Sequence, residues 1–251
     1  MSKRATSFTG KRIDFNAHIL VAPRDEVESI EESYVLLKRL VELGFSRVVC
    51  TPRYVPTREM DERVMAGEYQ KQVSGLETTA RFDGRKVKVA LGSEVFICRG
   101  IERLVAEQKI VPLEKRYILI RLPERGKMVL EMVEKLLIEL REKDWVPILA
   151  GAERSEYLQE DFRRVNKLAG TGAMFQCGYG TMLGLNGRGA ERLMEYMLER
   201  KYCDFLGTEV KKLDDAVVNP KKFEKAEKKI LKLIGGEWYE KIMRNAEGVL
   251  E

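Results

Sequence analysis

The chain has 251 residues, of which 34% are charged and 44% are hydrophobic, and its formal net charge is +5. This composition is typical of a globular protein and excludes a disordered or fibrous chain, and the length fits one large α/β domain or two small ones. No apolar run approaches the roughly 18 residues that a membrane helix needs, and no signal peptide is recognisable, so we expect no membrane span.

The first eleven residues are polar and basic, and we expect them to form a flexible N-terminal tail before a single domain over residues 12–251. A solvated tail is favoured over a targeting or partner-binding arm. The four cysteines are widely spaced and form no Cys-x-x-Cys pair, which predicts reduced thiols in a cytoplasmic protein.

Short apolar runs of strand length alternate along the chain with longer runs of helical period. The predicted strands are residues 12–15, 47–51, 88–91, 117–122, 146–150, 174–177 and 203–207. The predicted helices are residues 29–43, 59–80, 100–107, 127–142, 156–169, 187–200, 220–234 and 237–250. The first helix carries one apolar stripe, made of Ile30, Leu37, Leu40 and Val41.

Seven units of strand followed by helix, without a dinucleotide-type glycine fingerprint, favour a closed or nearly closed parallel sheet with helices outside it. The predicted fold is therefore α/β, a TIM-like (β/α)7 barrel in a single domain. A doubly wound open sheet is the alternative topology.

Lysine and arginine are interleaved with acidic residues except over residues 221–232. This stretch reads as an amphipathic helix whose inner side carries Phe223, Ala226, Ile230 and Leu233. A solvated helical face is favoured over a nucleic-acid groove, because neither an aromatic platform nor a known motif accompanies the lysines. We therefore expect no nucleic-acid partner.

Polar side chains follow at least five of the predicted strands. The segments are Asn16-Ala17-His18, Thr51-Pro52-Arg53-Tyr54, Gly92-Ser93-Glu94-Val95, Gly151-Ala152-Glu153-Arg154 and Thr208-Glu209-Val210-Lys211. In barrels of this kind the chemistry lies on the loops after the strands, so we expect these segments to meet in one site. His18 is the only histidine of the chain.

These five segments, in this order, resemble the motifs of the PHP (polymerase and histidinol phosphatase) superfamily. The first resembles its Ile-Asp-x-His-x-His strand, the second Thr-Pro-His-Tyr, the third Gly-x-Glu, the fourth Ala-His-Pro-Glu-Arg and the last Ser-Asp-x-His. Their spacing is most similar to that of the bacterial manganese-dependent tyrosine phosphatases encoded with capsule and exopolysaccharide genes. The resemblance runs from about residue 12 to the C-terminus and implies a PHP-type distorted barrel.

Carried over by position, the resemblance implies a depleted set of metal ligands. The matching positions hold His18, Glu94, Glu209 (a glutamate in place of an aspartate) and Asp25, which is the second member of an acidic pair whose first position is Arg24. The positions where the family has histidines hold Asn16, Arg53, Gly151 and Lys211.

The chemistry of these replacements argues against a metal cluster. A guanidinium or an ammonium group offers no lone pair to a metal, and Arg53 cannot lose its proton in a protein. A unit charge about 4 Å from a divalent ion is repelled by roughly 8 kcal/mol at an effective dielectric constant near 20. We expect no cofactor. The alternative is one divalent cation, Mn²⁺ or Mg²⁺, held by the four remaining ligands with a carbonyl oxygen of Asn16.

The introduced cations suggest a compensation for the lost metals. Without metal ions, Glu94 and Glu209 are left crowded and partly buried, which costs free energy. We hypothesise that Arg24, Arg53 and Lys211 replace the metals as counter-charges. In the alternative, selection on the site has lapsed and these residues point to solvent.

Arg154 matches the position that holds phosphate in the family, and a planar bidentate donor suits a phosphoryl group. The predicted anion-binding set is Arg154, Arg53 and Lys211. The alternative is a structural arginine that pairs with Glu153 or caps the following helix.

The function favoured by these residues is that of a degenerate tyrosine phosphatase, a pseudophosphatase that binds a phosphorylated tyrosine or another anionic partner in exopolysaccharide or capsule regulation. The resemblance implies a bacterial tyrosine kinase, through its phosphorylated tail, as that partner. A working phosphatase with one metal ion is the second hypothesis. A structural subunit that acts through homo-oligomerisation is the third.

Overall fold

A computed structural model describes residues 8–56, 63–126 and 129–251, and within these ranges every pair of neighbouring strands is parallel. One sheet has the order β1-β2-β4, with β1 at Arg12–Ala17, β2 at Phe45–Cys50 and β4 at Lys88–Leu91. The other has the order β3-β5-β6-β7-β8-β9, with bounds Arg53–Tyr54, Glu94–Phe96, Tyr117–Arg121, Val146–Ala150, Met174–Gly178 and Phe205–Gly207.

The two sheets form one wall, because β2 continues into β3 and β4 continues into β5. The interruption lies at Pro52, which has no N–H to donate to a ladder. Across it the N–H of Gly92 donates to the carbonyl of Cys50 at 2.9 Å, and that of Glu94 donates to the carbonyl of Pro52 at 3.2 Å. The two short strands β3 and β5 were not predicted, but they extend predicted strands and leave seven strand positions in the wall.

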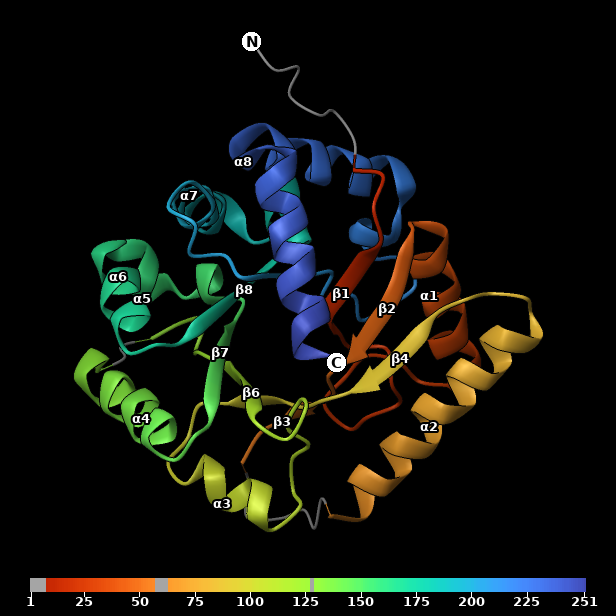
Figure 1. Ribbon diagram of the computed structural model, residues 1–251, viewed down its shortest axis with the longest axis horizontal. Helices are drawn as coiled ribbons and strands as arrows, with labels where there is room; N and C mark the ends of the chain where they lie inside the picture. Colours follow the sequence, from red (N-terminus) through yellow and green to blue (C-terminus); the bar gives the residue numbers. More distant parts are fainter. Residues whose placement is uncertain (1–7, 57–62, 127–128) are drawn as a thin grey trace.

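The wall curls back on itself between β9 and β1. Beyond the end of β9, the N–H of Glu209 donates to the carbonyl of Asn16, and the N–H of His18 donates to the carbonyl of Val210, both at 2.8 Å. Figure 1 shows the helices α1 to α7 outside this wall. The predicted TIM-like (β/α)7 arrangement is therefore confirmed, in a distorted form, and the doubly wound alternative is wrong.

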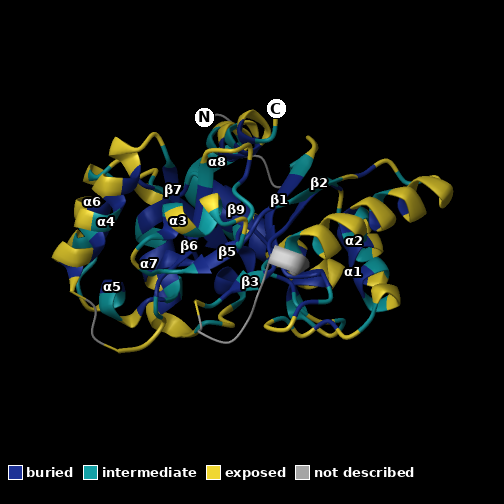
Figure 2. Ribbon diagram, turned by 90° about the horizontal axis from the view of Figure 1, so that it is seen from below, coloured by how far each residue is buried: buried dark blue, intermediate teal, exposed yellow. Residues whose placement is uncertain are grey.

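Most predicted helices are present with small shifts at their ends. The outer helices are α1 Ile30–Glu42, α2 Arg63–Phe82, α3 Ile101–Ala106, α4 Leu130–Glu142, α5 Glu156–Glu160, α6 Arg163–Gly170 and α7 Gly187–Glu199. The predicted starts at residues 59 and 127 lie outside the described residues. Figure 2 shows that most of the strands are buried and that the outward helix faces are exposed, and β4 is the exception, with Lys88 exposed and its other residues half-buried.

Two details of the helices correct the predictions. The single helix predicted over 156–169 is wrong, because Asp161 is extended (φ −148°, ψ 101°) between α5 and α6. Its side chain accepts the N–H of Arg163 at 3.0 Å, a local bond that competes with the helical one. In α1 the predicted stripe is confirmed at Leu37 and Leu40, but Ile30 is 46% exposed, and Ser33 and Leu36 are buried in addition.

The last helix, α8 (Pro220–Val249), is bent at Gly235, where φ is 77° and ψ is 164°. This bend lies where the sequence predicted a break between two helices. The second half of α8 crosses the middle of the molecule in Figure 1. Its residues Ala246 and Val249 pack against the interior of the barrel, where the rings of Phe15 and Phe205 stack with centroids 4.1 Å apart. No helix in the described part of the chain is long and apolar enough to cross a membrane.

The start of the chain is tied to α8. Arg12 binds the carboxylate of Glu227 through two hydrogen bonds of 2.7 and 2.9 Å, and the ring of Phe8 lies 4.9 Å from that of Tyr239. Of the predicted tail 1–11, residues 1–7 lie outside the described residues. Its flexibility stays a prediction.

Candidate functional site

The polar segments meet at the carboxyl ends of the strands, as predicted. Side chains from six strand ends form a largely buried cluster of acidic groups, arginines and one histidine, which we call the arginine–carboxylate cluster. Its members are His18, Asp25, Arg53, Glu94, Arg121, Arg154 and Glu209. The side chains of His18, Asp25 and Glu94 have no exposed surface.

Glu94, at the start of β5, is the most heavily paired carboxylate. Its Oε1 accepts from Asn16 Nδ2 at 2.9 Å and from Arg121 Nη1 at 3.2 Å, and its Oε2 lies 3.7 Å from Arg53 Nε. Burial opposes ionisation, but the charge of Arg121, the hydrogen bond from Asn16 and the charge of Arg53 outweigh it and lower the pKa of Glu94 to about 2. Glu94 is therefore an ionised acid held by arginine side chains.

Arg53 joins Glu94 to Asp25. Its Nε lies 3.7 Å from Oδ1 of Asp25, and its backbone N–H donates to Oδ2 of Asp25 at 3.3 Å. Burial raises the pKa of Asp25 to about 7, although Arg53 works against this rise. The hypothesis that Arg53 is a counter-charge therefore agrees with its position in the structure.

His18 is a buried, neutral imidazole. Its Nδ1 lies 2.9 Å from the carbonyl oxygen of Thr51, which can only accept, so Nδ1 carries the proton and Nε2 has the free lone pair. Burial is the largest influence on its pKa and lowers it to about 4. Nε2 lies 3.8 Å from Oε2 of Glu94 and has no hydrogen-bond partner among the described residues.

Arg154 fills the place of the missing side chain at Gly151. Its Nη1 lies 2.8 Å from Oε2 of Glu209. A Cβ atom on Gly151 would lie 2.9 Å from Arg154 Nε and 3.0 Å from Glu209 Oε1. A histidine could not stand at position 151 without displacing both groups. The pairing of Arg154 with Glu153 that the sequence suggested is wrong, since its ion partners are Glu209 and, at 3.5 Å, Glu124.

Glu153 is instead a separate buried acid. Its Oε1 accepts from the N–H of Gly178 and from Oγ1 of Thr181, both at 2.9 Å. Burial, with the nearby carboxylate of Glu209, raises the pKa of Glu153 to about 7. Burial is likewise the main cause of the raised pKa of Glu209.

Two of the three predicted counter-charges are not in the cluster. Lys211 Nζ pairs with Glu26 at 2.7 Å, and Arg24 is exposed. Their predicted pairing with Glu94 and Glu209 is therefore wrong, because the loops that carry them direct them outward. Arg121, at the end of β6, is the second counter-charge of Glu94, and it was not predicted from the sequence. A single charged residue that ends an apolar strand was the available signal.

The residues present do not fit a cluster of metal ions. Asp25 Oδ1 and Glu94 Oε2 are buried oxygens with no hydrogen-bond partner in the described part of the chain, and Arg53 Nε lies 3.7 Å from each of them. The guanidinium thus stands beside the oxygens that would face a cation. Among the described residues, no group of three or more histidine, cysteine or acidic side chains is arranged to hold a metal.

The sequence is similar to a known protein family and to two named relatives. A family model described as "Capsular polysaccharide synthesis, CpsB/CapC" matches residues 12–251. The putative tyrosine-protein phosphatase CapC of Staphylococcus aureus is 23% identical over 198 residues, which is 78% of this chain and 76% of that protein. The tyrosine-protein phosphatase YwqE of Bacillus subtilis is 23% identical over 205 residues, with the same coverage.

Two solved structures have a similar fold. One is described as YwqE from Bacillus subtilis and CpsB from Streptococcus pneumoniae, unique metal-dependent tyrosine phosphatases, with a TM-score of 0.82, 22% identity and coverage of 95% of this chain and 94% of that chain. The other is a histidinol phosphate phosphatase from Lactococcus lactis with zinc, with a TM-score of 0.52, 13% identity and coverage of 89% and 94%. At these identities the likeness concerns the fold alone.

Proposed function

Because the chain belongs to the CpsB/CapC family of capsular polysaccharide synthesis, two of whose relatives are named tyrosine phosphatases, we propose that it is a member impaired in catalysis. In this proposal it binds a phosphorylated tyrosine or a similar anion without hydrolysing it. Binding an anion needs cations and N–H donors, whereas hydrolysis also needs an activated water.

The observation that carries the proposal is the position of Arg53. Its guanidinium lies 3.7 Å from the free oxygens of both Asp25 and Glu94, and it is a permanent cation. It therefore neutralises the carboxylates that would otherwise favour a divalent ion. A protein that holds arginines in this place has the charge of a metal site without its Lewis acidity.

The anion contacts would come from Arg154 and Arg53. Two nitrogens of Arg154, Nε and Nη2, are buried and have no hydrogen-bond partner among the described residues, although Nε lies 3.5 Å from Glu124 Oε1. An anion therefore reaches them only if Glu124, which is half exposed, moves aside. The side chain of Arg53 is 20% exposed and borders a small hollow that is also lined by Arg24 and Lys109. This hollow holds only about 10 Å³, so a phosphate group requires Arg24 or Lys109 to move aside. Lys211, paired with Glu26, would act only from the rim.

The partner in this proposal is a phosphorylated tyrosine segment, such as the tail of a bacterial tyrosine kinase, in the regulation of capsule or exopolysaccharide synthesis. We also infer a cytoplasmic location, because all four cysteines are free and three of them are buried.

The test combines binding, turnover and metal content. We expect a phosphotyrosine peptide to bind, its unphosphorylated form to bind more weakly, and no turnover with added Mn²⁺. Arg154→Ala should weaken the binding, whereas Arg188→Ala, at an exposed position of α7, should not. Equal affinity for the two peptides would refute the proposal.

A working phosphatase with one metal ion is the second candidate. It is favoured by three buried atoms with free lone pairs, which are His18 Nε2, Asp25 Oδ1 and Glu94 Oε2. If this candidate is right, protein purified without chelator contains stoichiometric Mn²⁺ or Mg²⁺, and Glu94→Gln abolishes phosphotyrosine turnover. Absence of both metal and turnover would refute it.

A further inference from the structure

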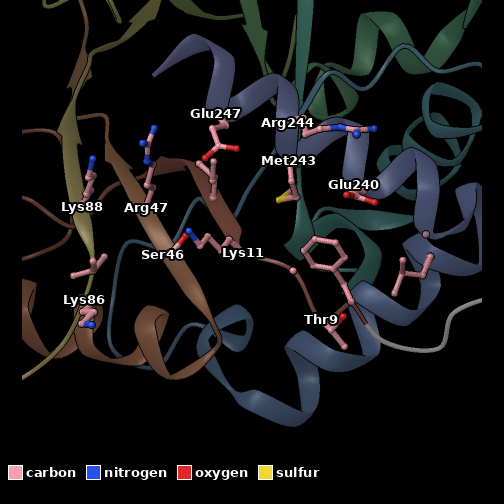
Figure 3. A pocket seen from close by; sticks show the side chains of 16 residues that line it. Thr9, Lys11, Ser46, Arg47, Lys86, Lys88, Glu240, Met243, Arg244 and Glu247 are labelled. Carbon is pink, nitrogen blue, oxygen red and sulfur yellow. The ribbon is translucent and has the colours of Figure 1, made fainter. Parts of the chain in front are cut away.

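A cavity of about 870 Å³ opens at the end of the barrel opposite the arginine–carboxylate cluster. It lies between the first residues of β1, β2 and β4 and the second half of α8, as Figure 3 shows. Its volume is within the range of about 300–1,000 Å³ that is usual for ligand-binding pockets. We call it the basal groove, and the proposed function makes no use of it.

The strand side of the basal groove is positively charged. It carries Lys11, Arg47, Lys86 and Lys88, which lie along one wall in Figure 3. Three of the four, the lysines, are exposed and have no ion pair among the described residues. Unpaired cations held on one wall repel each other weakly and favour an anionic ligand.

The helix side is mixed in character. It carries Arg244 with Glu240 and Glu247, and the apolar side chain of Met243 lies between them. The lining therefore has five cations and two carboxylates. Further apolar contacts come from Phe8 and Ile13. A ligand that matches this groove combines negative charges, directed to the strands, with apolar groups.

The geometry argues against a compact anion such as a single phosphate. Compact anions are usually bound at a helix N-terminus, where several N–H groups converge. The second half of α8 starts at this groove, after Gly235, but it carries the carboxylate of Glu240 in its first turns. The positive charge comes from long side chains on separate segments, which suits carboxylates that are spread along a chain.

The outer edge of β4 offers a further means of binding. Within the described residues β4 pairs only with β2, so its other edge has backbone groups available for an extended segment. Lys88 is the first residue of β4, and Lys86 lies two residues before it. Lysine on a free edge discourages pairing between like sheets, but it is complementary to an acidic strand.

We propose that the basal groove binds an extended acidic segment of a partner protein, in which Asp or Glu alternates with apolar residues. The acidic side chains face Lys86, Lys88 and Arg47, and the apolar ones face Met243 and α8. The binding is electrostatic in large part, so it weakens as the salt concentration rises.

The probe is a fluorescent peptide of alternating Glu and Leu, titrated with the full chain and followed by anisotropy. We expect saturable binding that Lys86→Glu/Lys88→Glu weakens by roughly tenfold or more. The matched control is Lys222→Glu/Lys225→Glu, which makes the same change in net charge at exposed positions of α8 outside the groove. It should retain the parent affinity within about twofold.

Four outcomes would overturn the proposal. They are the absence of saturable binding, equal weakening by the two double variants, displacement of the peptide by inorganic phosphate at equal charge, and self-association that only Lys86→Glu/Lys88→Glu abolishes. The second would indicate general charge attraction, the third a compact-anion site, and the fourth a second copy of this chain as the occupant. Circular dichroism of both double variants shows whether each is folded. Normal binding by a folded groove variant is a fifth outcome that would overturn the proposal.

Discussion

Arg121 Nη1 lies 3.2 Å from Glu94 Oε1, and the two side chains are 6% and 0% exposed. This ion pair joins the end of β6 to the start of β5 in the centre of the arginine–carboxylate cluster. Buried pairs of this kind add little net stability, but the loss of one partner leaves an uncompensated charge in the interior.

Arg121→Met should therefore lower the free energy of unfolding by about 3 kcal/mol, because Glu94 stays buried and loses its closest cation. The double variant Arg121→Met/Glu94→Leu should recover part of this loss, since it buries no unpaired charge. Urea denaturation measures both. Arg103→Met removes an exposed arginine and should have no measurable effect. A similar loss in the double variant would show that packing, and not charge, is the cause.

Arg53→His should create affinity for one divalent ion. The substitution removes a fixed charge whose repulsion of a divalent ion is roughly 8 kcal/mol and adds an imidazole beside the free lone pairs of Asp25 and Glu94. Calorimetric titration with Mn²⁺ and metal analysis after desalting measure the gain. Arg53→Lys keeps the charge and should bind no metal. Stoichiometric Mn²⁺ in the parent chain would contradict the argument.

Gly151→Ala should destabilise the protein by about 1–3 kcal/mol, because φ is 55° at this position and a Cβ would meet the guanidinium of Arg154 at 2.9 Å. The double variant Gly151→Ala/Arg154→Ala should be destabilised by less than the sum of the two single substitutions, since the second change removes the clash. Gly75→Ala in α2 is the matched control, because nothing lies within 4 Å of its added methyl group and helix propensity favours alanine. Thermal unfolding that ranks these variants in any other order would refute the account.

Titration of the Asp204 carboxyl group should lower the free energy of unfolding as the pH rises from about 4 to about 6. Burial raises the pKa of this carboxyl from 3.8 to about 6. The folded state therefore holds its proton more tightly than the unfolded state does, and this contribution is complete below pH 4 and is lost as the pH rises through 6. Asp204→Asn keeps an oxygen for the N–H of Phe175, which is 2.9 Å away.

The variant should therefore be close to the parent in stability near pH 4 and exceed it by roughly 3 kcal/mol at pH 7.5. Urea midpoints at both pH values measure the difference, and the comparison with the parent cancels the other titrating groups. Equal midpoints for parent and variant at pH 7.5 would contradict the raised pKa.

The seven-unit barrel could be predicted from the sequence because hydrophobic period and strand length are local properties. The same holds for the gathering of the polar segments, since loops that follow parallel strands meet at one end of a barrel. The bounds of individual strands and helices were predicted less well where a single residue interrupts the pattern. Pro52 split one wall position into β2 and β3, and the side chain of Asp161 divided a helix whose apolar period continues through it.

The partners within the cluster could not be predicted. Arg53 was expected to be a counter-charge and lies beside Asp25 and Glu94, but Lys211 was also expected there and pairs with Glu26 instead. Arg121 was not predicted to belong to the cluster, because it ends an ordinary apolar strand without a recognisable motif. Nothing in the order of residues says which long side chain reaches which carboxylate.

The sequence by itself therefore determined the chemical types available to this protein: one imidazole, no lone pairs at Arg53 or Lys211, and no side chain at Gly151. The tertiary structure alone decided that Arg121 meets Glu94 and that Arg154 occupies the space beside Gly151. The reason is physical. Protonation and the presence of a donor atom belong to a single residue, whereas an ion pair depends on the distance between strands that are far apart in the chain and come together only when the barrel curls.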